Sequence, residues 1–371
     1  MKNPFLHRLE DNQRSDYVSS DCSINRLMIK KLPIYGVDDS IEGLTVKEFF
    51  NTQLFIDEIK KNADTLKIEL DKETEKRLPI KLAEKLSSDD SEASECAIQI
   101  ARKFGKRLGL LFLALRLGEK QNRDARKDWT DEHWAYWAQI EDIALVGGLA
   151  SGNIGKIFKQ EIENVFELAH KEPYNILLYE NSAVAGVYGC ATQISEKNGV
   201  NIVMDFGQTN IKRSYVTKCA GEITDVKTLD PYLSQYMDWE MLSEEETLKQ
   251  AKLLHKLLLK AIKDTYKTAK EQTGIEPNRE IVISIASYTV DGVINDQRSG
   301  YAKLSALGSN YAECLYWDLS GELRKDVVIK LIHDGTAFAL NFSDRKSTIC
   351  LSLGSFFGVG FPDTKLIWPE Y

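Results

Sequence analysis

The chain has 371 residues, of which 43% are hydrophobic and 28% are charged, and its net charge is −8. The length predicts two domains or one large two-lobed unit, because single cores stop growing near about 250–300 residues. The acidic balance disfavours a nucleic-acid-binding protein that works by phosphate neutralisation. No apolar run approaches the ~20 residues that span a bilayer. The polar start of the chain and the scattered cysteines predict a cytoplasmic protein with reduced thiols.

The first part of the chain is predicted to be mainly helical. Residues 1–45 are irregular, with short strand-like pieces such as INRLMIKKLPIYG. From Thr45 the spacing of apolar residues predicts a helix, and SSDDSEASECAIQIARKFGKRLGLLFLALRLG predicts a long helix opened by Ser and Asp caps. Residues 119–138 are polar and contain three tryptophans. Of the two uses we consider, core packing and a platform for sugar stacking, we favour core packing.

From about residue 140 onward, strands alternate with helices and glycine-containing loops. A strand, a Gly-Gly turn and a helix form IEDIALVGGLASGNIGKIF, and NSAVAGVYGCATQI predicts a helix of small residues. Ser243 and Glu246 form a capping box for a helix that ends before Gly274. This alternation predicts an α/β protein. The further predicted strands are NILLYE, Ile202 to Asp205, Ile211 to Val216, EIVISIAS, VVIKLIHD and the start of STICLSLGSFFGVGF.

The stretch DFGQTNIK joins two of these strands and suits a phosphate. Gly207 lets the backbone approach a phosphate closely, while Thr209 and Asn210 offer hydrogen-bond donors. Asp205 could bind Mg²⁺ through water, and Lys212 adds a positive charge. The alternative is an ordinary hairpin turn closed by Asn and Gly.

Two other glycine-rich turns suit a nucleotide. LGSFFGVG at 353–360 has the composition of a phosphate-wrapping hairpin, and LVGGLASG at 145–152 presents flat backbone where adenine or ribose could lie. Taken alone, the turn at 353–360 favours an ordinary glycine-containing hairpin, and the turn at 145–152 is only a weak signal for a nucleotide.

One acid stands out at the end of a buried strand. Asp334 follows VVIKLIH and opens the next helix, where a partly desolvated carboxylate could accept a proton from a substrate hydroxyl. The alternative is that Asp334 only caps the helix N-terminus.

Together these stretches resemble the actin/hexokinase/Hsp70 superfold, and most closely sugar kinases of the ROK (repressor, open reading frame, kinase) and glucokinase type. DFGQTNIK resembles the first phosphate loop of that group, HDGTAFAL the segment with the catalytic base, LGSFFGVGF the second phosphate loop and ALVGGLASG the adenosine motif. AVAGVYGCA resembles the closing helix, and TVDGVINDQRSGYAKLSALG a segment of the sugar lobe. The resemblance covers roughly residues 85 to 365.

The motifs keep the family's cyclic order but begin at a different point. Here the adenosine motif comes first, followed by the first phosphate loop, the base and the second phosphate loop. We therefore expect a circularly permuted, two-lobed ribonuclease H-like (actin-like ATPase) α/β fold, in which the loop SEKNGVN joins the original ends. The expected lobes are 181–343, with the first phosphate loop and the catalytic Asp, and 344–371 plus 1–180, with the second phosphate loop and the adenosine motif.

The resemblance implies an ATP- and Mg²⁺-dependent kinase for a hydroxyl of a sugar or sugar derivative. It assigns Asp334 as the catalytic base, Asp205 to the metal, and His333 and Asp291 to the substrate. A small-molecule substrate is the expected partner, without nucleic acid or membrane, and a homodimer is left open. The implied nucleotide-binding residues are Gly207, Gln208, Thr209, Asn210, Lys212, Gly354, Ser355, Gly358, Gly147 and Gly148.

Some positions depart from the family pattern. Phe356 and Val359 stand where glycines are usual in the second loop, Gln208 replaces a glycine of the first loop, and His333 replaces the asparagine before the base. The E-x-G-H segment and the Cys-rich zinc motif of many ROK proteins have no match in residues 1–90. These departures favour an alternative, a non-catalytic sugar- or nucleotide-binding sensor or pseudokinase. A nucleotide-driven assembly ATPase is a third, less favoured class.

Overall fold

The computed structural model describes residues 2–7, 14–71, 77–238, 242–296 and 299–368 of a mixed α/β protein. The chain forms two compact units. The first unit comprises Met1–Phe5, Asp21–Val184 and Ser347–Val359, and the second comprises Leu6–Ser20, Ala185–Lys346 and Gly360–Tyr371. These units differ from the expected lobes in four segments: 6–20, 344–346 and 360–371 belong to the second unit, and 181–184 belong to the first.

The first unit contains a four-stranded sheet in the order β13-β12-β3-β4. β12 pairs in parallel with β3, Cys350 opposite Ala144, although about two hundred residues separate them in the chain. β3 is buried at every residue, as is typical of a parallel strand covered on both faces. The strands are β3 (Asp142–Val146), β4 (Asn175–Leu178), β12 (Thr348–Leu353) and β13 (Phe357–Gly360).

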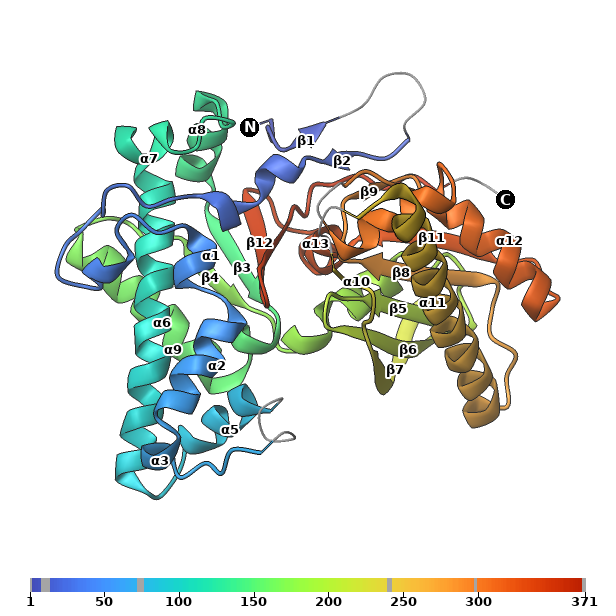
Figure 1. Ribbon diagram of the computed structural model, residues 1–371, viewed down its shortest axis with the longest axis horizontal. Coiled ribbons are helices and arrows are strands. Elements are labelled where there is room, and N and C mark those ends of the chain that lie inside the picture. Colours follow the sequence, from blue (N-terminus) through green and yellow to red (C-terminus); the bar gives the residue numbers. More distant parts are fainter. Residues whose placement is uncertain (1, 8–13, 72–76, 239–241, 297–298, 369–371) are drawn as a thin grey trace. The chain divides into compact units, whose positions relative to one another are not determined.

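Helices make up most of the first unit. The longest, α6, runs side by side with α9 (Figure 1). Trp129, Trp134 and Trp137 are 6%, 1% and 0% exposed, which confirms that these tryptophans pack in a core. The α-helices are α1 (Val46–Phe49), α2 (Thr52–Lys61), α3 (Ala63–Leu66), α5 (Leu78–Lys85), α6 (Ser91–Leu117), α7 (Lys120–Asp124), α8 (Asp131–Gln139) and α9 (Gly152–Leu168). The 3₁₀ helices are η2 (Ile24–Arg26), η3 (Asp39–Ile41), η4 (Gly148–Ala150) and η5 (Ser182–Val184), and η1 (Ser20–Cys22) crosses the unit boundary.

The second unit contains a five-stranded sheet in the order β11-β8-β5-β6-β7. β11, β8 and β5 are parallel, and β5, β6 and β7 form an antiparallel meander. The strands of this sheet are β5 (Gly199–Phe206), β6 (Asn210–Cys219), β7 (Glu222–Leu233), β8 (Glu280–Ile285) and β11 (Val328–His333). Two small hairpins also belong to this unit: β1 (Leu6–His7) with β2 (Tyr17–Val18), and β9 (Thr289–Val290) with β10 (Val293–Ile294).

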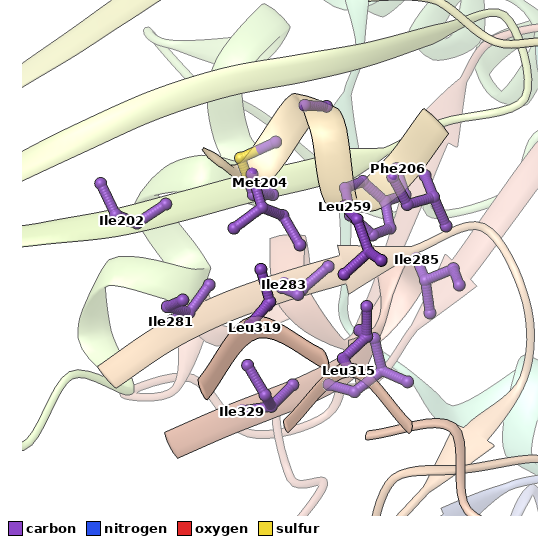
Figure 2. Packing of buried hydrophobic residues seen from close by; sticks show 14 of the residues in the cluster. Ile202, Met204, Phe206, Leu259, Ile281, Ile283, Ile285, Leu315, Leu319 and Ile329 are labelled. Atoms are coloured by element: carbon purple, nitrogen blue, oxygen red, sulfur yellow. The ribbon is translucent and has the colours of Figure 1, made fainter. Parts of the chain in front are cut away.

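Long helices cover one face of this sheet (Figure 1). Alternate residues of a strand point to opposite faces, and Figure 2 shows one face meeting α11 and α12 in the core. The residues labelled there are Ile202, Met204 and Phe206 of β5, Ile281, Ile283 and Ile285 of β8, Ile329 of β11, Leu259 of α11, and Leu315 and Leu319 of α12. The helices are α10 (Ala185–Thr192), α11 (Glu244–Thr273), α12 (Tyr311–Leu323) and α13 (Asp334–Ala339), with 3₁₀ helices η6 (Gly300–Leu307) and η7 (Leu340–Phe342).

The opposite face of the same sheet carries buried polar groups beneath α10. A Cβ on Gly186 of α10 would lie 3.6 Å from the Asp205 carboxylate and 3.7 Å from the Ser284 hydroxyl. Further along this face, Lys330 Nζ lies 2.6 Å from Glu280 Oε1, and both side chains are almost fully buried. This face of the sheet therefore carries charged side chains, and the small residues of α10 let the helix approach it closely.

Some sequence expectations were wrong or incomplete. The strand-like piece INRLMIKKLPIYG contains no named strand: it begins with η2 and contributes one bridge, Met28 to Thr45, because local turns use its backbone groups. The helix expected from Thr45 is interrupted between α1 and α2, where Asn51 caps the second helix. β7 was not predicted, since its exposed, charged sequence lacks a buried face. Residues 297–298 of the expected sugar-lobe segment lie outside the described residues.

Replacing Lys330 by Met should lower the free energy of unfolding by about 3–5 kcal/mol, because it leaves the Glu280 carboxylate buried without its cation. Urea denaturation measures the change. The matched control is Lys267→Met, which removes one partner of an exposed pair with Glu271 and should change stability little. Equal stability of the Lys330 variant and the wild type would contradict this account of the pair.

Gly189→Ala should destabilise the protein, by about 1–3 kcal/mol or more, because the close crossing of α10 and α13 has no room for a side chain. A Cβ on Gly189 would lie 1.6 Å from the Ala337 carbonyl oxygen. Gly321→Ala on α12 is the control: its Cβ would meet nothing within 4 Å, and the change should be neutral or stabilising. Thermal unfolding of both variants is the measurement, and a neutral Gly189→Ala would be incompatible with this crossing.

Candidate functional site

Two carboxylates lie at one edge of the second unit's sheet. β5, β8 and β11 are parallel, with Phe206 opposite Ile285 and Ile285 opposite His333, so their carboxyl ends meet at the same edge. Asp205 is the last residue but one of β5, and Asp334 directly follows β11. In open α/β sheets this edge is where ligands bind.

The Asp205 carboxylate is buried, and each of its oxygens accepts one hydrogen bond. Its Oδ2 lies 2.8 Å from Lys212 Nζ on β6, and its Oδ1 accepts a hydrogen bond of 2.8 Å from Ser284 Oγ on β8. The negative charge of Asp205 raises the pKa of Lys212. Burial, reinforced by Asp205, likewise raises the pKa of the neighbouring Cys190 thiol on α10. Asp205 is thus an anionic oxygen donor already balanced by one cation.

The Asp334 carboxyl group is less well compensated. Burial first, and then the negative charges of Asp205 and Asp296, raise its pKa to about 7, while Lys212 and the Gly335 amide act in the opposite direction. The side chain is still 33% exposed. A carboxyl group with a pKa near 7 and access to solvent has the properties of a general base at neutral pH.

His333 packs directly beside this carboxyl group. Its Nε2 lies 3.2 Å from Asp334 Oδ1, and its ring stacks on Tyr288 with centroids 4.6 Å apart and planes 19° from parallel. Burial lowers the pKa of His333 to about 3, so the imidazole is neutral at physiological pH. His333 occupies the N-cap position of α13, and Asp334 lies in the first turn.

Two hydroxyl groups fix the loop after β5 through one backbone carbonyl. The Gly207 carbonyl oxygen accepts hydrogen bonds from Tyr301 OH at 2.9 Å and Ser234 Oγ at 2.7 Å. Because the peptide bond is planar and trans, the Gln208 N–H points away from these two donors. The Gln208 side chain donates to the Ala286 carbonyl at 3.2 Å, while Thr209 is exposed. The Gln208 side chain therefore ties this loop to the loop after β8.

In the first unit, the turns around Gly147 and Gly354 lie together. Gly147 has a φ of 96°, and a Cβ there would lie 2.7 Å from the carbonyl oxygen of Leu353, the residue before Gly354. The Gly147 amide donates to the Ser182 carbonyl at 3.1 Å, and a Cβ on Gly148 would meet nothing within 4 Å. The adenosine-like turn thus packs backbone to backbone on the strand that leads into the second glycine-rich loop.

That second loop, at 354–358, is fixed at both ends. The Gly354 carbonyl accepts from the Thr52 amide at 3.1 Å, and the Gly358 amide donates to Ser352 Oγ at 3.1 Å. Ser355 is exposed, and Phe356 is 57% exposed at the loop tip. Val359 is only 2% exposed and packs inward.

Asp291 lies in the turn between β9 and β10. It has a φ of 49° and is followed by Gly292 at 84°, the combination of a tight hairpin turn. Its Oδ2 accepts from the Arg14 amide at 2.8 Å, and its carbonyl accepts from Asn310 Nδ2 at 3.1 Å. The contacts of Asp291 are therefore with backbone and loop groups.

Several residues at this edge were not identified from the sequence. Ser284 interrupts the apolar strand EIVISI, and this polar residue in a buried strand was an available signal. Asp296 acts on Asp334 from a loop, and Tyr301 and Ser234 hold Gly207 from positions far along the chain. No local pattern distinguishes these three.

The fold and side chains therefore define an α/β protein with an acid pair at a sheet edge. No protein-family model matches the chain, and no curated protein matches it. Among solved structures it is similar to hexokinase from Schistosoma mansoni complexed with glucose, at 14% identity and a TM-score of 0.26, over 41% of this chain and 37% of that chain. The match thus spans well under half of the hexokinase, and at this level the function has to be argued from the side chains themselves.

Two other observations concern the described residues only. Among their helices, none is long and apolar enough to cross a membrane. The same residues contain no group of three or more His, Cys, Asp or Glu side chains placed to hold a metal ion.

The raised pKa of Asp334 predicts a pH-dependent effect of Asp334→Asn on stability. The folded-state pKa of about 7 exceeds the ordinary value of 3.8, so ionisation of Asp334 opposes folding as the pH rises between these values. The Asn variant should match the wild-type melting temperature below about pH 4, gain stability up to about pH 7, and keep that gain above it.

Asp264→Asn is the control of opposite sign. Hydrogen bonds from Tyr232 and then Lys260 lower the pKa of Asp264, so its charged form stabilises the folded state. This variant should lose melting temperature as the pH rises out of the acid range. Differential scanning calorimetry from pH 3 to pH 8 measures both, and a pH-independent difference for Asp334→Asn would show that its carboxyl group titrates normally.

Proposed function

We propose that the protein is an ATP-dependent kinase that phosphorylates a hydroxyl of a sugar or sugar derivative, built on a circularly permuted ribonuclease H-like fold. The two sheets support the fold assignment. β6-β5-β8-β11 in the second unit and β13-β12-β3-β4 in the first share one order: a hairpin partner, the strand before a glycine-containing loop, and two parallel strands. The three-residue connection between β12 and β13 requires an antiparallel hairpin, as in β5 and β6.

The chain order of these equivalent strands supports the permutation. In the second unit the hairpin of β5 and β6 precedes the parallel strands β8 and β11. In the first unit the parallel strands β3 and β4 come early, and the equivalent hairpin of β12 and β13 comes last. Moving the C-terminal hairpin in front of β3 would give both units the same order.

The observation that carries the kinase proposal is the position of Asp334, whose partly exposed carboxyl group lies at the carboxyl edge of the sheet. Burial raises the pKa of this group to about 7, which suits acceptance of a proton from an attacking hydroxyl. Asp205, the nearby acid, is balanced by Lys212 instead. Active sites often contain two carboxyl groups in environments that push their pKa values apart, and the two groups then have different roles. Here Asp334 would serve as the base and Asp205 would bind the metal ion.

The residues at this edge fit Mg²⁺ and ATP. Mg²⁺ is commonly bound by one or two carboxylates together with phosphates and water, so the Asp205 carboxylate beside the Ser284 hydroxyl is a suitable donor set. When bound, Mg²⁺ would neutralise phosphate charge. The outward Gln208 N–H and the Lys212 ammonium group would hold phosphate oxygens. The turns around Gly147 and Gly354 remain predicted parts of the nucleotide-binding site.

A specific observation favours a second candidate, a sugar- or nucleotide-binding sensor without catalysis. Phe356 places an exposed aromatic ring at a loop tip where related kinases usually have glycine. A bulky residue there limits close approach of phosphate to the backbone. The partners proposed under both functions are small molecules, in a cytoplasmic protein; a homodimer is compatible with either, and nucleic acid is disfavoured by the net charge of −8.

The test begins with binding and then measures turnover. Isothermal titration with ATP and Mg²⁺ detects the nucleotide site, and a coupled ADP-release assay over hexoses, acetylated hexosamines and polyols identifies an acceptor. Binding without turnover on any acceptor would favour the sensor. Absence of nucleotide binding would contradict the kinase.

With an acceptor in hand, Asp334→Asn should lower kcat by about 10²–10⁴-fold and leave ATP affinity nearly unchanged, because a general base contributes on that scale. Asp205→Asn should instead weaken the Mg²⁺-dependent part of ATP binding. Asp264→Asn, on α11 and bonded to Tyr232 and Lys260, serves as the matched control. Full activity of Asp334→Asn would reduce that residue to a helix-terminal role and exclude the mechanism.

A further inference from the structure

The carbonyl oxygen of Gly207 accepts hydrogen bonds from two side-chain hydroxyls that come from distant parts of the chain. Ser234 Oγ, just beyond the end of β7, lies 2.7 Å from this oxygen, and Tyr301 OH, in η6, lies 2.9 Å from it. A carbonyl oxygen only accepts, so both hydroxyls donate their hydrogens to it. The two donors occupy both lone pairs and fix the direction of the peptide group that joins Gly207 to Gln208.

The fixed peptide group presents its N–H on the opposite side. In a planar trans peptide the Gln208 N–H is antiparallel to the Gly207 C=O, so it points away from both hydroxyls. Across the residues that the structure describes, no backbone carbonyl accepts a hydrogen bond from this N–H. An oriented backbone N–H in a glycine-containing turn is a donor suited to a phosphate oxygen.

Both hydroxyl donors are themselves held in place. Tyr301 is fully buried, and its ring stacks on Phe206 with centroids 6.4 Å apart and planes 21° from parallel. Burial raises the pKa of Tyr301 far above its ordinary value, so this donor keeps its hydrogen at physiological pH. The Ser234 N–H donates to the Thr209 carbonyl at 3.0 Å, so Ser234 bonds to the turn on both sides of Gln208.

Lys303 connects the supports of the two donors. It follows Tyr301 in η6 and is only 7% exposed. Its Nζ donates to the carbonyl oxygens of Tyr236 at 2.6 Å and Asp238 at 2.7 Å, in the segment that follows Ser234. Through Tyr301, η6 therefore contacts the turn directly, and through Lys303 it holds the segment that supplies Ser234.

We propose that Ser234 and Tyr301 are positioning residues for the nucleotide. By donating to the Gly207 carbonyl, their hydroxyls aim the next backbone N–H at a phosphate oxygen of ATP. This inference rests on the proposed kinase function and gives it two residues that the resemblance does not assign. The turn has its orientation before ATP arrives, so binding loses less free energy to ordering the loop.

Two substitutions remove the hydroxyls one at a time. Ser234→Ala keeps the backbone hydrogen bond to Thr209 and loses the bond to the Gly207 carbonyl. Tyr301→Phe keeps the ring against Phe206 and loses the other bond. If Tyr301→Phe fails to fold, Ser234→Ala at its half-buried position still decides the question.

Tyr232→Phe and Ser305→Ala are the matched controls. The Tyr232 hydroxyl, on β7, donates to Asp264 and accepts from Lys260. The Ser305 hydroxyl, in η6, donates to the Ala302 carbonyl at 2.7 Å. Both controls remove a hydroxyl from the same two elements without a contact to the turn, so neither should change ATP affinity.

Isothermal titration with ATP in excess Mg²⁺, and separately with adenosine, measures the positioning role. Ser234→Ala and Tyr301→Phe should each weaken ATP binding about 3- to 10-fold, the scale of one hydrogen bond, and leave adenosine affinity unchanged. The double variant should lose more than the product of the single losses, because either hydroxyl alone still orients the carbonyl. Equal weakening of ATP and adenosine, or unchanged ATP affinity in the double variant, would overturn the proposal.

NMR provides a readout that needs no activity. The dipeptide Gly-Gln occurs once in the chain, so ¹³C-carbonyl glycine with ¹⁵N-glutamine labels one peptide group, that of Gly207 and Gln208. A carbonyl carbon resonates at lower field when its oxygen accepts hydrogen bonds, so its signal should move upfield in Ser234→Ala and in Tyr301→Phe. Mg²⁺–ATP should shift the N–H signal of the wild type. A carbonyl signal that neither substitution moves would overturn the proposal.

Failure of this inference and failure of the kinase function give different results. If the wild type binds no Mg²⁺–ATP, the kinase function fails and the inference falls with it. If the wild type binds ATP and the double variant binds it equally well, the nucleotide site stands and the positioning role is wrong.

Discussion

The close approach of α10 to the second unit's sheet and to α13 is the constraint on which the acid pair depends. Glycine at 186 brings the helix over the Asp205 carboxylate, and glycine at 189 brings its backbone against the Ala337 carbonyl. A helix with larger residues would stand further off and would admit water to the buried Asp205 carboxylate. The small-residue helix thus sets the local dielectric at the sheet edge, and through it the ionisation of nearby groups.

Asp205 and Asp334 show how unequal environments arise at one edge of a sheet. Asp205 lies on β5, and Lys212 lies directly opposite it on the antiparallel partner β6. The register of this hairpin therefore places a cation beside the Asp205 carboxylate. Asp334 opens a helix after a parallel strand, where its neighbours are the Gly335 amide and a neutral imidazole. Each acid receives its partner from its own local topology.

The sequence predicted best those features that depend on neighbours along the chain. The strand ends at Asp205 and Asp334, the Gly-Gly turn before α9 and the cap at Ser243 all follow from local patterns, and the structure contains the corresponding elements. The supports of the site were not predictable in that way. Tyr301 reaches the Gly207 carbonyl across 94 residues, and Tyr288 meets His333 only because β9 follows β8 beside β11. The exposed strand β7 was missed because it has no buried face to produce an alternating pattern.

The pairing of β12 with β3 has a consequence for how the protein is made. β12 lies between β13 and β3, so the first unit's sheet cannot close until the ribosome has delivered residues beyond 347. The second unit draws most of its residues from the continuous segment Ala185–Lys346, and its five-stranded sheet is complete once β11 has emerged. During synthesis the sheet of the second unit can therefore form before the sheet of the first unit. Until β12 is synthesised, the apolar edge of β3 that will pair with β12 remains unpaired. Chains interrupted shortly before β12 would expose that edge and be prone to aggregate.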